Sequence, residues 1–178
     1  MKIKELLHEK GLRYETGLSS DEIKKIEKLY DIRFPLELKQ IYMELLPTSK
    51  GFYKWRDFSD SNIEYIKRII LSTFEDVKTE IEYIEWNELW GKEPDESEKR
   101  RIIEEKLKTA PKLIPIYSHR YVVSGERETS PVLSICGLDI IYYGENLNQY
   151  FEIEFNKKSP NEMDYKKIAK VPFWSEIM

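Results

Sequence analysis

Two histidines and one cysteine are the side chains of this sequence best suited to acid–base or nucleophilic chemistry. His8 lies on a short amphipathic segment, so we expect it at the surface. Cys136 lies in an apolar stretch, and we expect a small core residue rather than a nucleophile. His119, in Tyr117-Ser118-His119-Arg120-Tyr121, borders a turn between expected strands, where an imidazole can face a ligand. Only His119 therefore has a position open to direct chemistry.

The short motifs of the common enzyme classes do not occur in the sequence. It has no phosphate-binding glycine loop, dinucleotide fingerprint, Gly-x-Ser-x-Gly elbow or His-Glu-x-x-His helix. Glu80, Glu82, Glu85 and Glu88 recur in a mixed-charge setting that is typical of a solvent-exposed helix face, not of a paired acid–base site. We therefore expect no catalytic residues, no metal and no cofactor.

Composition and charge limit the possible partners and the compartment. With 29 Lys and Arg against 33 Asp and Glu, the net charge of −4 gives no broad attraction to nucleic acid. A single cysteine excludes an internal disulfide and a thiolate zinc site, which favours a reducing compartment. No signal peptide or membrane-spanning run is evident. We expect a cytoplasmic protein of one domain, residues 1–178, that binds neither membranes nor nucleic acid directly.

Helical patterns dominate the first two thirds of the chain. Ser19 and Glu22 form a capping box at the start of a helix, and Leu18 can pack against Ile23. Pro35 suits the first turn of the next helix, which Pro47 ends. The other expected elements are a short helix over 3–10, a strand over 51–58, one kinked helix or two helices over 62–90, and a charged helix over 98–108.

After Pro111 the pattern changes to strands, expected over 113–117, 121–123, 132–135, 140–143 and 150–155. The apolar segment 171–177 is expected to dock as a short last helix. Helices first and strands later, with short connections, predict an α+β fold. We expect a mainly antiparallel sheet of about five or six strands, with helices packed on one side.

Aromatic residues make up 13% of the chain, including 12 Tyr and 4 Trp, which suits both cores and protein interfaces. Alternation over 139–143 places Ile140 and Tyr142 on one face of a strand and Asp139, Ile141 and Tyr143 on the other. One face of this strand is therefore expected to be only partly covered, which would make it a docking surface.

These residues together resemble the SUKH superfamily, the Smi/Knr-type domain of fungal cell-wall assembly regulators and of many bacterial proteins. The likeness extends over nearly the whole chain from Gly17 onward. A departure is Leu46-Pro47-Thr48, where the family often has Asn-Gly after its second helix. The matching residues are Gly17-Leu18-Ser19, Glu22-Ile23, Glu27, Phe34-Pro35, Leu38, Ile41-Tyr42, Trp55, Asp57-Phe58, Leu113-Ile114-Pro115-Ile116, Pro131-Val132, Asp139-Ile140-Ile141-Tyr142-Tyr143-Gly144, Leu147 and Tyr150-Phe151.

The resemblance implies an α+β domain without enzymatic activity. Bacterial members are thought to act as immunity proteins that bind and neutralise toxins, often nucleases, delivered between competing cells. We expect such an immunity protein, with a general scaffold or regulatory protein-binding module as the alternative. An unrecognised hydrolase that uses His119 is a third possibility. The expected partner-contact residues are Trp55, Asp57, His119, Arg120, Asp139, Tyr143 and Tyr150, although Trp55 and Tyr150 also suit the core.

Overall fold

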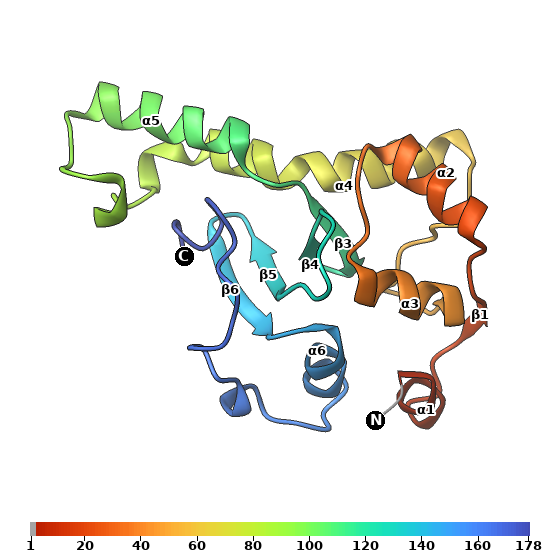
Figure 1. Cartoon of the computed structure of the whole chain (residues 1–178). Helices are drawn as coiled ribbons and strands as arrows, with labels where there is room; N and C mark the ends of the chain where they lie inside the picture. The colour runs from red at the N-terminus through yellow and green to blue at the C-terminus, as the bar shows by residue number, and fades with distance from the viewer. Residues whose placement is uncertain (1–2) are drawn as a thin grey trace.

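In the computed structural model, which describes residues 3–178, helices precede a run of strands, as Figure 1 shows. The helices are α1 (Ile3–Glu9), α2 (Ser20–Tyr30), α3 (Leu36–Glu44), α4 (Asp60–Thr79), α5 (Glu96–Thr109) and α6 (Leu147–Glu154). The strands are β1 (Tyr14–Thr16), β2 (Leu45–Pro47), β3 (Leu113–Tyr117), β4 (Arg120–Val123), β5 (Val132–Cys136) and β6 (Asp139–Gly144). Short 3₁₀ turns occur at η1 (Ile81–Tyr83), η2 (Glu88–Trp90) and η3 (Pro160–Glu162).

The strands form two antiparallel sheets, so the predicted α+β class with antiparallel pairing is confirmed. The larger sheet has the order β3-β4-β5-β6 and consists of consecutive hairpins. The β5–β6 hairpin turns at Gly137, whose φ of 61° suits glycine at the first central position of a tight turn. The smaller sheet pairs β1 with β2, a contact between distant segments that no local pattern predicted.

Buried side chains cover both faces of the larger sheet, so its packing extends beyond the one face expected. Ile114 and Val122 belong to a core shared with α1, α2, α3, α6 and the first half of α4. Leu113 and Val123, their neighbours in sequence, belong to a second core shared with the end of α4, α5 and the C-terminal segment. We call these the first core and the second core. Strand alternation separates them, because successive side chains point to opposite faces.

The capping box predicted for α2 is present. Ser19 Oγ accepts a hydrogen bond from Glu22 N at 3.2 Å, and Glu22 Oε2 accepts one from Ser19 N at 2.8 Å. At the next helix, Pro35 occupies the N-cap position just before α3, without a side-chain cap. Residues 31–35 link α2 to α3, and both helices contribute side chains to the first core.

The expected division into two helices does not occur within α4, which is continuous through Ser72 and Thr73. Their hydroxyls donate to the carbonyls of Ile69 and Ile70 at 2.9 and 3.3 Å, so these two poor helix formers hydrogen-bond within the helix. Beyond Thr79 the predicted helical run is replaced by the 3₁₀ turns η1 and η2. None of the helices within residues 3–178 is long and apolar enough to cross a bilayer.

Three predicted elements were wrong. Segment 51–58 is a series of turns with one bridge, Phe52 to Tyr117, because the core draws in its aromatic side chains. Segment 150–155 lies in α6 instead of a strand, since Asn146 caps that helix and Leu147, Tyr150 and Phe151 share its buried face. Segment 171–177 is turns, although Trp174 is fully buried and donates from Nε1 to Pro111 O at 2.8 Å.

Candidate functional site

Figure 1 shows α6 directly after β6, at the end of the larger sheet. Side chains from three strands line up on the sheet face from which Arg120 contacts α6. In the strand register Arg120 lies opposite Ser134, and Ser134 lies opposite Ile141. Two residues further along, Cys136 lies opposite Asp139 on the same face. We call this group the β6 surface: Arg120, Ser134, Cys136, Asp139, Ile141 and Tyr143.

Arg120 is the central residue of the β6 surface. Its Nε donates to Glu154 Oε2 at 3.1 Å, and its Nη1 donates to Ser134 Oγ at 2.8 Å. The guanidinium lies 3.8 Å from the ring centre of Tyr143, a cation–π distance. The residue is only 9% exposed, so Glu154 supplies the opposite charge that a buried cation requires. Arg120 thus fixes the end of α6 against β4, β5 and β6.

Tyr150 supports this surface from behind. It is fully buried in the first core, with its ring centre 6.2 Å from that of Tyr143. Gly144 permits the approach, because a Cβ at this position would lie 2.6 Å from Tyr150 Cβ. Burial raises the pKa of Tyr150 well above the usual value, and nearby Glu154 acts in the same direction. Tyr150 is therefore a neutral core residue, which is the second of the two roles expected for it.

His119 lies in the exposed turn that joins β3 to β4. Its Nδ1 is 3.2 Å from Ser118 Oγ, and Ser118 has a positive φ of 49°. Tyr53 Oη donates to Ser118 O at 2.7 Å, which holds the turn against the first core. Partial burial of the ring and the charge of Arg120 lower the pKa of His119, so its imidazole is neutral near pH 7.

The outer part of the β6 surface is open to solvent. Ile140 is 3% exposed, whereas its neighbour Ile141 is 47% exposed. Asp139 is exposed and Tyr143 is half-buried, as the strand alternation predicted. Cys136 is also exposed, which contradicts its predicted core position. It is the last residue of β5, next to the hairpin turn, and points to the open face rather than into the second core.

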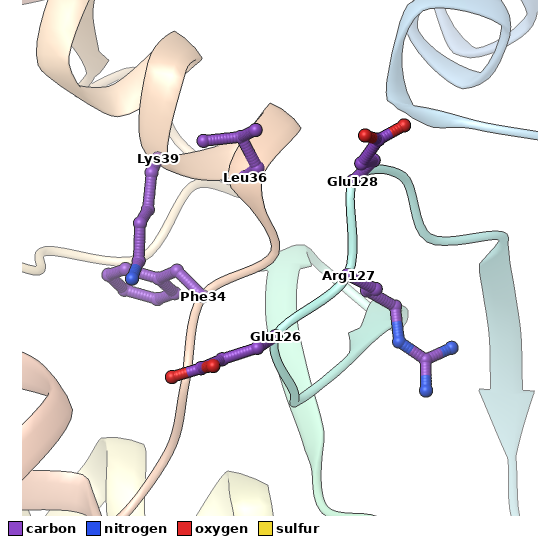
Figure 2. Close-up of a pocket in the computed structure, with 6 residues that line it drawn as sticks. All are labelled: Phe34, Leu36, Lys39, Glu126, Arg127 and Glu128. Atoms are coloured by element: carbon purple, nitrogen blue, oxygen red, sulfur yellow. The ribbon is translucent and has the colours of Figure 1, made fainter.

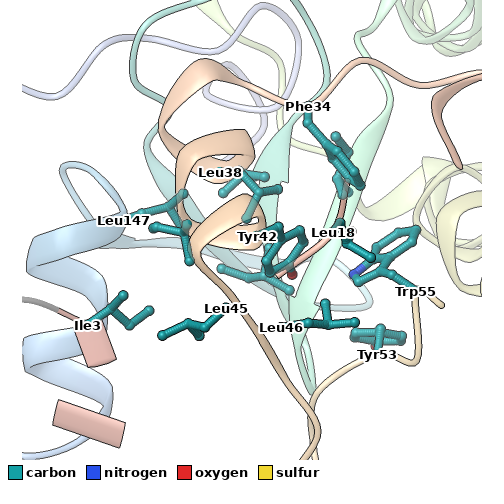
Figure 3. Packing of buried hydrophobic residues seen from close by; sticks show 14 of the residues in the cluster. Ile3, Leu18, Phe34, Leu38, Tyr42, Leu45, Leu46, Tyr53, Trp55 and Leu147 are labelled. Carbon is teal, nitrogen blue, oxygen red and sulfur yellow. The ribbon is translucent and has the colours of Figure 1, made fainter. Parts of the chain in front are cut away.

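The remaining two predicted contact residues lie elsewhere. Trp55 is fully buried, with its ring 5.5 Å from Tyr30 and 5.4 Å from Phe34, and it belongs to the first core shown in Figure 3. Trp55 thus takes the core role that was the alternative expected for it. Asp57 is half-buried before α4, where Ser59 N donates to its carboxylate at 3.0 Å and lowers its pKa.

Asp57 lines a shallow pocket of about 330 Å³ beside Arg56. The guanidinium of Arg56 donates to Glu22 at 2.7 Å, to Glu15 at 3.2 Å and to the carbonyl of Gly17 at 2.9 Å. These bonds join the start of α2 to the neighbouring strand β1. The charges in this pocket are thus engaged in holding the fold together.

Figure 2 shows another pocket, of about 320 Å³, between the start of α3 and the β4–β5 loop. Glu126 reaches toward Phe34 and Lys39, while the guanidinium of Arg127 points away from them. Leu36 N donates to Arg127 O at 2.9 Å, so the loop supplies an acceptor that the uncapped helix start needs. The Lys39 ammonium, 2.9 Å from Glu27 Oε1, is already paired. The pocket therefore serves chiefly to connect the loop to α3.

Glu37, the next residue of α3, connects this region to α6. Its carboxylate accepts hydrogen bonds from Leu147 N at 3.1 Å and from Asn148 N at 3.2 Å. Burial raises the pKa of Glu37, although both hydrogen bonds act in the opposite direction. The carboxylate thus caps α6, the helix that carries Tyr150 and Glu154, and so positions the β6 surface from a distance.

The structure brings together His119, Arg120, Asp139 and Tyr143, with Tyr150 beneath them, and leaves Trp55 and Asp57 apart. Ile141 and Cys136 were absent from the predicted contact set, although the alternation that places Ile140 inside could have found Ile141. Glu154 could not be found, since its role depends on α6. Within residues 3–178 no group of three or more His, Cys, Asp or Glu is arranged to hold a metal ion.

Comparison with known proteins returns no match. No family model, no curated protein and no solved structure matches this chain.

Proposed function

We propose that this chain is a non-enzymatic, cytoplasmic protein-binding domain that acts as an immunity protein against a bacterial toxin. The single observation that supports it best is the open β6 surface, where the aliphatic side chain of Ile141 is 47% exposed beside Asp139. An apolar residue on a rigid strand, bordered by a charge, is typical of a protein-contact surface. The resemblance to the SUKH superfamily supplies the toxin as the kind of partner.

The position of β6 in the sheet supports a protein partner further. It is the last strand in the order, so one side of its backbone has no strand partner among the described residues. Backbone groups at such an edge can pair with a strand of another chain. Asp139 at the start of β6 opposes indiscriminate edge pairing, because a charged side chain makes stacking of identical edges costly. A selective partner is therefore favoured over self-aggregation.

Arg120 gives the surface the rigidity that binding needs. The side chains that hold it come from β5, β6 and α6, so Tyr143 and the backbone of β6 are fixed before a partner arrives. Preorganised contacts bind more tightly, because less conformational freedom is lost on association. In this proposal Ile141 and Tyr143 contact the toxin, Asp139 and His119 lie at the margin, and Arg120 supports them.

The test is co-expression of the chain with a panel of bacterial toxin domains, combined with affinity capture by the purified chain. We expect protection against one toxin, and at least about tenfold weaker capture of that toxin by the variant Ile141→Glu. Leu71→Glu is the matched control, because Leu71 is 54% exposed on α4 and is also aliphatic. The proposal would be contradicted if Ile141→Glu and Leu71→Glu protected cells equally well. It would also be contradicted if the unmodified chain protected cells from no toxin.

The same experiment separates the two alternatives. A scaffold or regulatory module would capture a host protein and protect cells from no toxin. A hydrolase would convert a substrate without any partner present, and His119→Ala would abolish that turnover. The exposed Ser118–His119 pair at 3.2 Å is the reason to include this variant.

A further inference from the structure

The connector between α4 and α5, taken together with the first residue of α5 as residues 80–96, carries outward-facing apolar side chains far from β6 in the sequence. Tyr83 is 72% exposed and Leu89 is 75% exposed, the two highest values among the large apolar side chains of residues 3–178. Figure 1 shows this connector at the end of the α4–α5 pair, beyond the sheet. Two large apolar side chains left in solvent on one short connector need an explanation.

The connector is held in place on its inner side, so the exposure of these residues is built into the fold. Trp86 and Trp90 pack edge to face at 5.4 Å, and Trp86 Nε1 donates to Gly91 O at 2.9 Å. Trp90 Nε1 donates to Glu176 Oε2 at 2.6 Å, and Asn87 Nδ2 donates to Glu176 O at 2.8 Å. Trp90, which also packs against the second core, thus faces the protein, and Trp86 packs on Trp90, while Tyr83 and Leu89 face solvent.

Charge identifies the kind of partner. Residues 80–96 contain seven acidic residues and one lysine, a net charge of −6, whereas the whole chain carries −4. The rest of the chain is therefore at +2, and the negative charge is concentrated on this connector. Glu82, Glu85 and Glu88 are exposed and make no ion pair within the described residues, in contrast to Glu93, which lies 3.4 Å from Lys99. Free carboxylates around apolar side chains suit a basic surface with apolar contacts.

We propose that residues 80–96 dock onto a basic protein surface, with Tyr83 and Leu89 as apolar contacts and Glu82, Glu85 and Glu88 facing lysines and arginines. This inference rests on the proposed function and narrows its partner to a protein with a basic patch. A standard interface buries ~800 Å² on each side, so one partner can contact a second surface of the chain in addition to β6.

The experiment places the photo-crosslinking residue p-benzoylphenylalanine at position 83 of the full-length chain, in cells of the organism that encodes it. Position 165 is the matched control, because Tyr165 is 62% exposed in the C-terminal region. We expect an adduct from position 83 alone, whose crosslinked peptide is rich in lysine and arginine. The crosslinking is then carried out in a cell lysate at two salt concentrations. The yield of the adduct should be at least about fivefold lower at 500 mM salt than at 50 mM salt.

Charge variants provide the decisive control. Replacing Glu82, Glu85 and Glu88 together by lysine should abolish the adduct, and replacing the same three by aspartate should retain it. The absence of an adduct, a crosslinked peptide without a basic excess, or an adduct that survives charge reversal would each overturn the inference. If the lysine variant protects cells from a toxin as well as the unmodified chain, the proposed function stands and the docking role of the connector fails. If position 83 crosslinks to a basic peptide but the unmodified chain protects cells from no toxin, the docking role of the connector stands and the proposed function fails.

Discussion

Arg56 and Arg120 show how differently the same side chain is used in two regions of this protein. Arg56 makes more hydrogen bonds, to two carboxylates and two carbonyls, yet its side chain is 32% exposed. Arg120 bonds to one carboxylate and one hydroxyl and lies over Tyr143, with its side chain 10% exposed. The first joins elements near the surface, and the second is enclosed beneath a candidate contact surface.

The comparison indicates that burial, and not the number of hydrogen bonds, sets the energetic importance of each arginine. Exposed charges exchange protein partners for water at little cost, whereas a buried charge that loses its partner cannot. The same contrast separates the exposed surroundings of Arg56 from the enclosed surroundings of Arg120. Four predictions test it, in order of expected effect.

The largest effect is expected at Gly17, whose carbonyl accepts a hydrogen bond from Arg56. A Cβ at this position would lie 1.9 Å from the backbone oxygen of Met43, which cannot move without shifting α3. We expect Gly17→Ala to lower the free energy of unfolding by more than about 3 kcal/mol, or to prevent folding. Urea denaturation measures it, with Gly11→Ala as the control.

Gly11 has a φ of 65° and no atom within 4 Å of an added Cβ, so its alanine variant should cost only about 1–2 kcal/mol. A loss at Gly17 no larger than the loss at Gly11 would show that the close approach to Met43 is relieved at little cost, since Gly17 does not have a positive φ.

The second prediction concerns the arginines themselves. Arg120→Ala leaves Glu154, whose side chain is 16% exposed, without its charge partner, and should cost about 3 kcal/mol. Arg56→Ala should cost about 1 kcal/mol, because Glu15 is 56% exposed and Glu22 is 29% exposed. Thermal or urea unfolding of both variants checks the order. A larger loss of stability in Arg56→Ala than in Arg120→Ala would show that the number of hydrogen bonds matters more than burial.

The third prediction uses pH. Hydrogen bonds from Arg56 and Ser19 lower the pKa of Glu22 from 4.5 to about 2. Its folded pKa is depressed, so its contribution is complete above about pH 4.5 and is lost as the pH falls toward 2. Because the carboxylate is partly exposed, we expect about 1 kcal/mol from this group. Urea unfolding at pH 5 and pH 3 should show a smaller loss of stability in Glu22→Gln than in the unmodified chain.

The smallest effect is expected at Cys136. Since its side chain is exposed on the open face, Cys136→Ser should change the free energy of unfolding by less than about 0.5 kcal/mol. The thiol should also react with a disulfide reagent in the folded state, without denaturant. A loss of about 2 kcal/mol in the free energy of unfolding, or a thiol that reacts only after unfolding, would indicate that Cys136 is buried in the core.

Local signals predicted much of the fold. The strands β3 to β6, helix α2 and the charged helix α5 lie close to their predicted positions, because turn residues and apolar periodicity specify them over a few residues. The pattern of apolar residues predicted a strand instead of α6, because Tyr150 and Phe151 suit a strand as well as a helix. That ambiguity was resolved by Asn146 and Glu37, which together satisfy the first backbone donors of the helix.

The sequence by itself determined the features that depend on near neighbours: the capping of α2 by Ser19 and Glu22, and the alternation that buries Ile140 and exposes Ile141. Only the tertiary structure decided which polar residues meet across the chain. Glu154 reaches Arg120 from 34 residues away, and Glu37 caps a helix 110 residues away. Such contacts depend on how whole elements pack, and the spacing of residues along the chain carries no information about that packing.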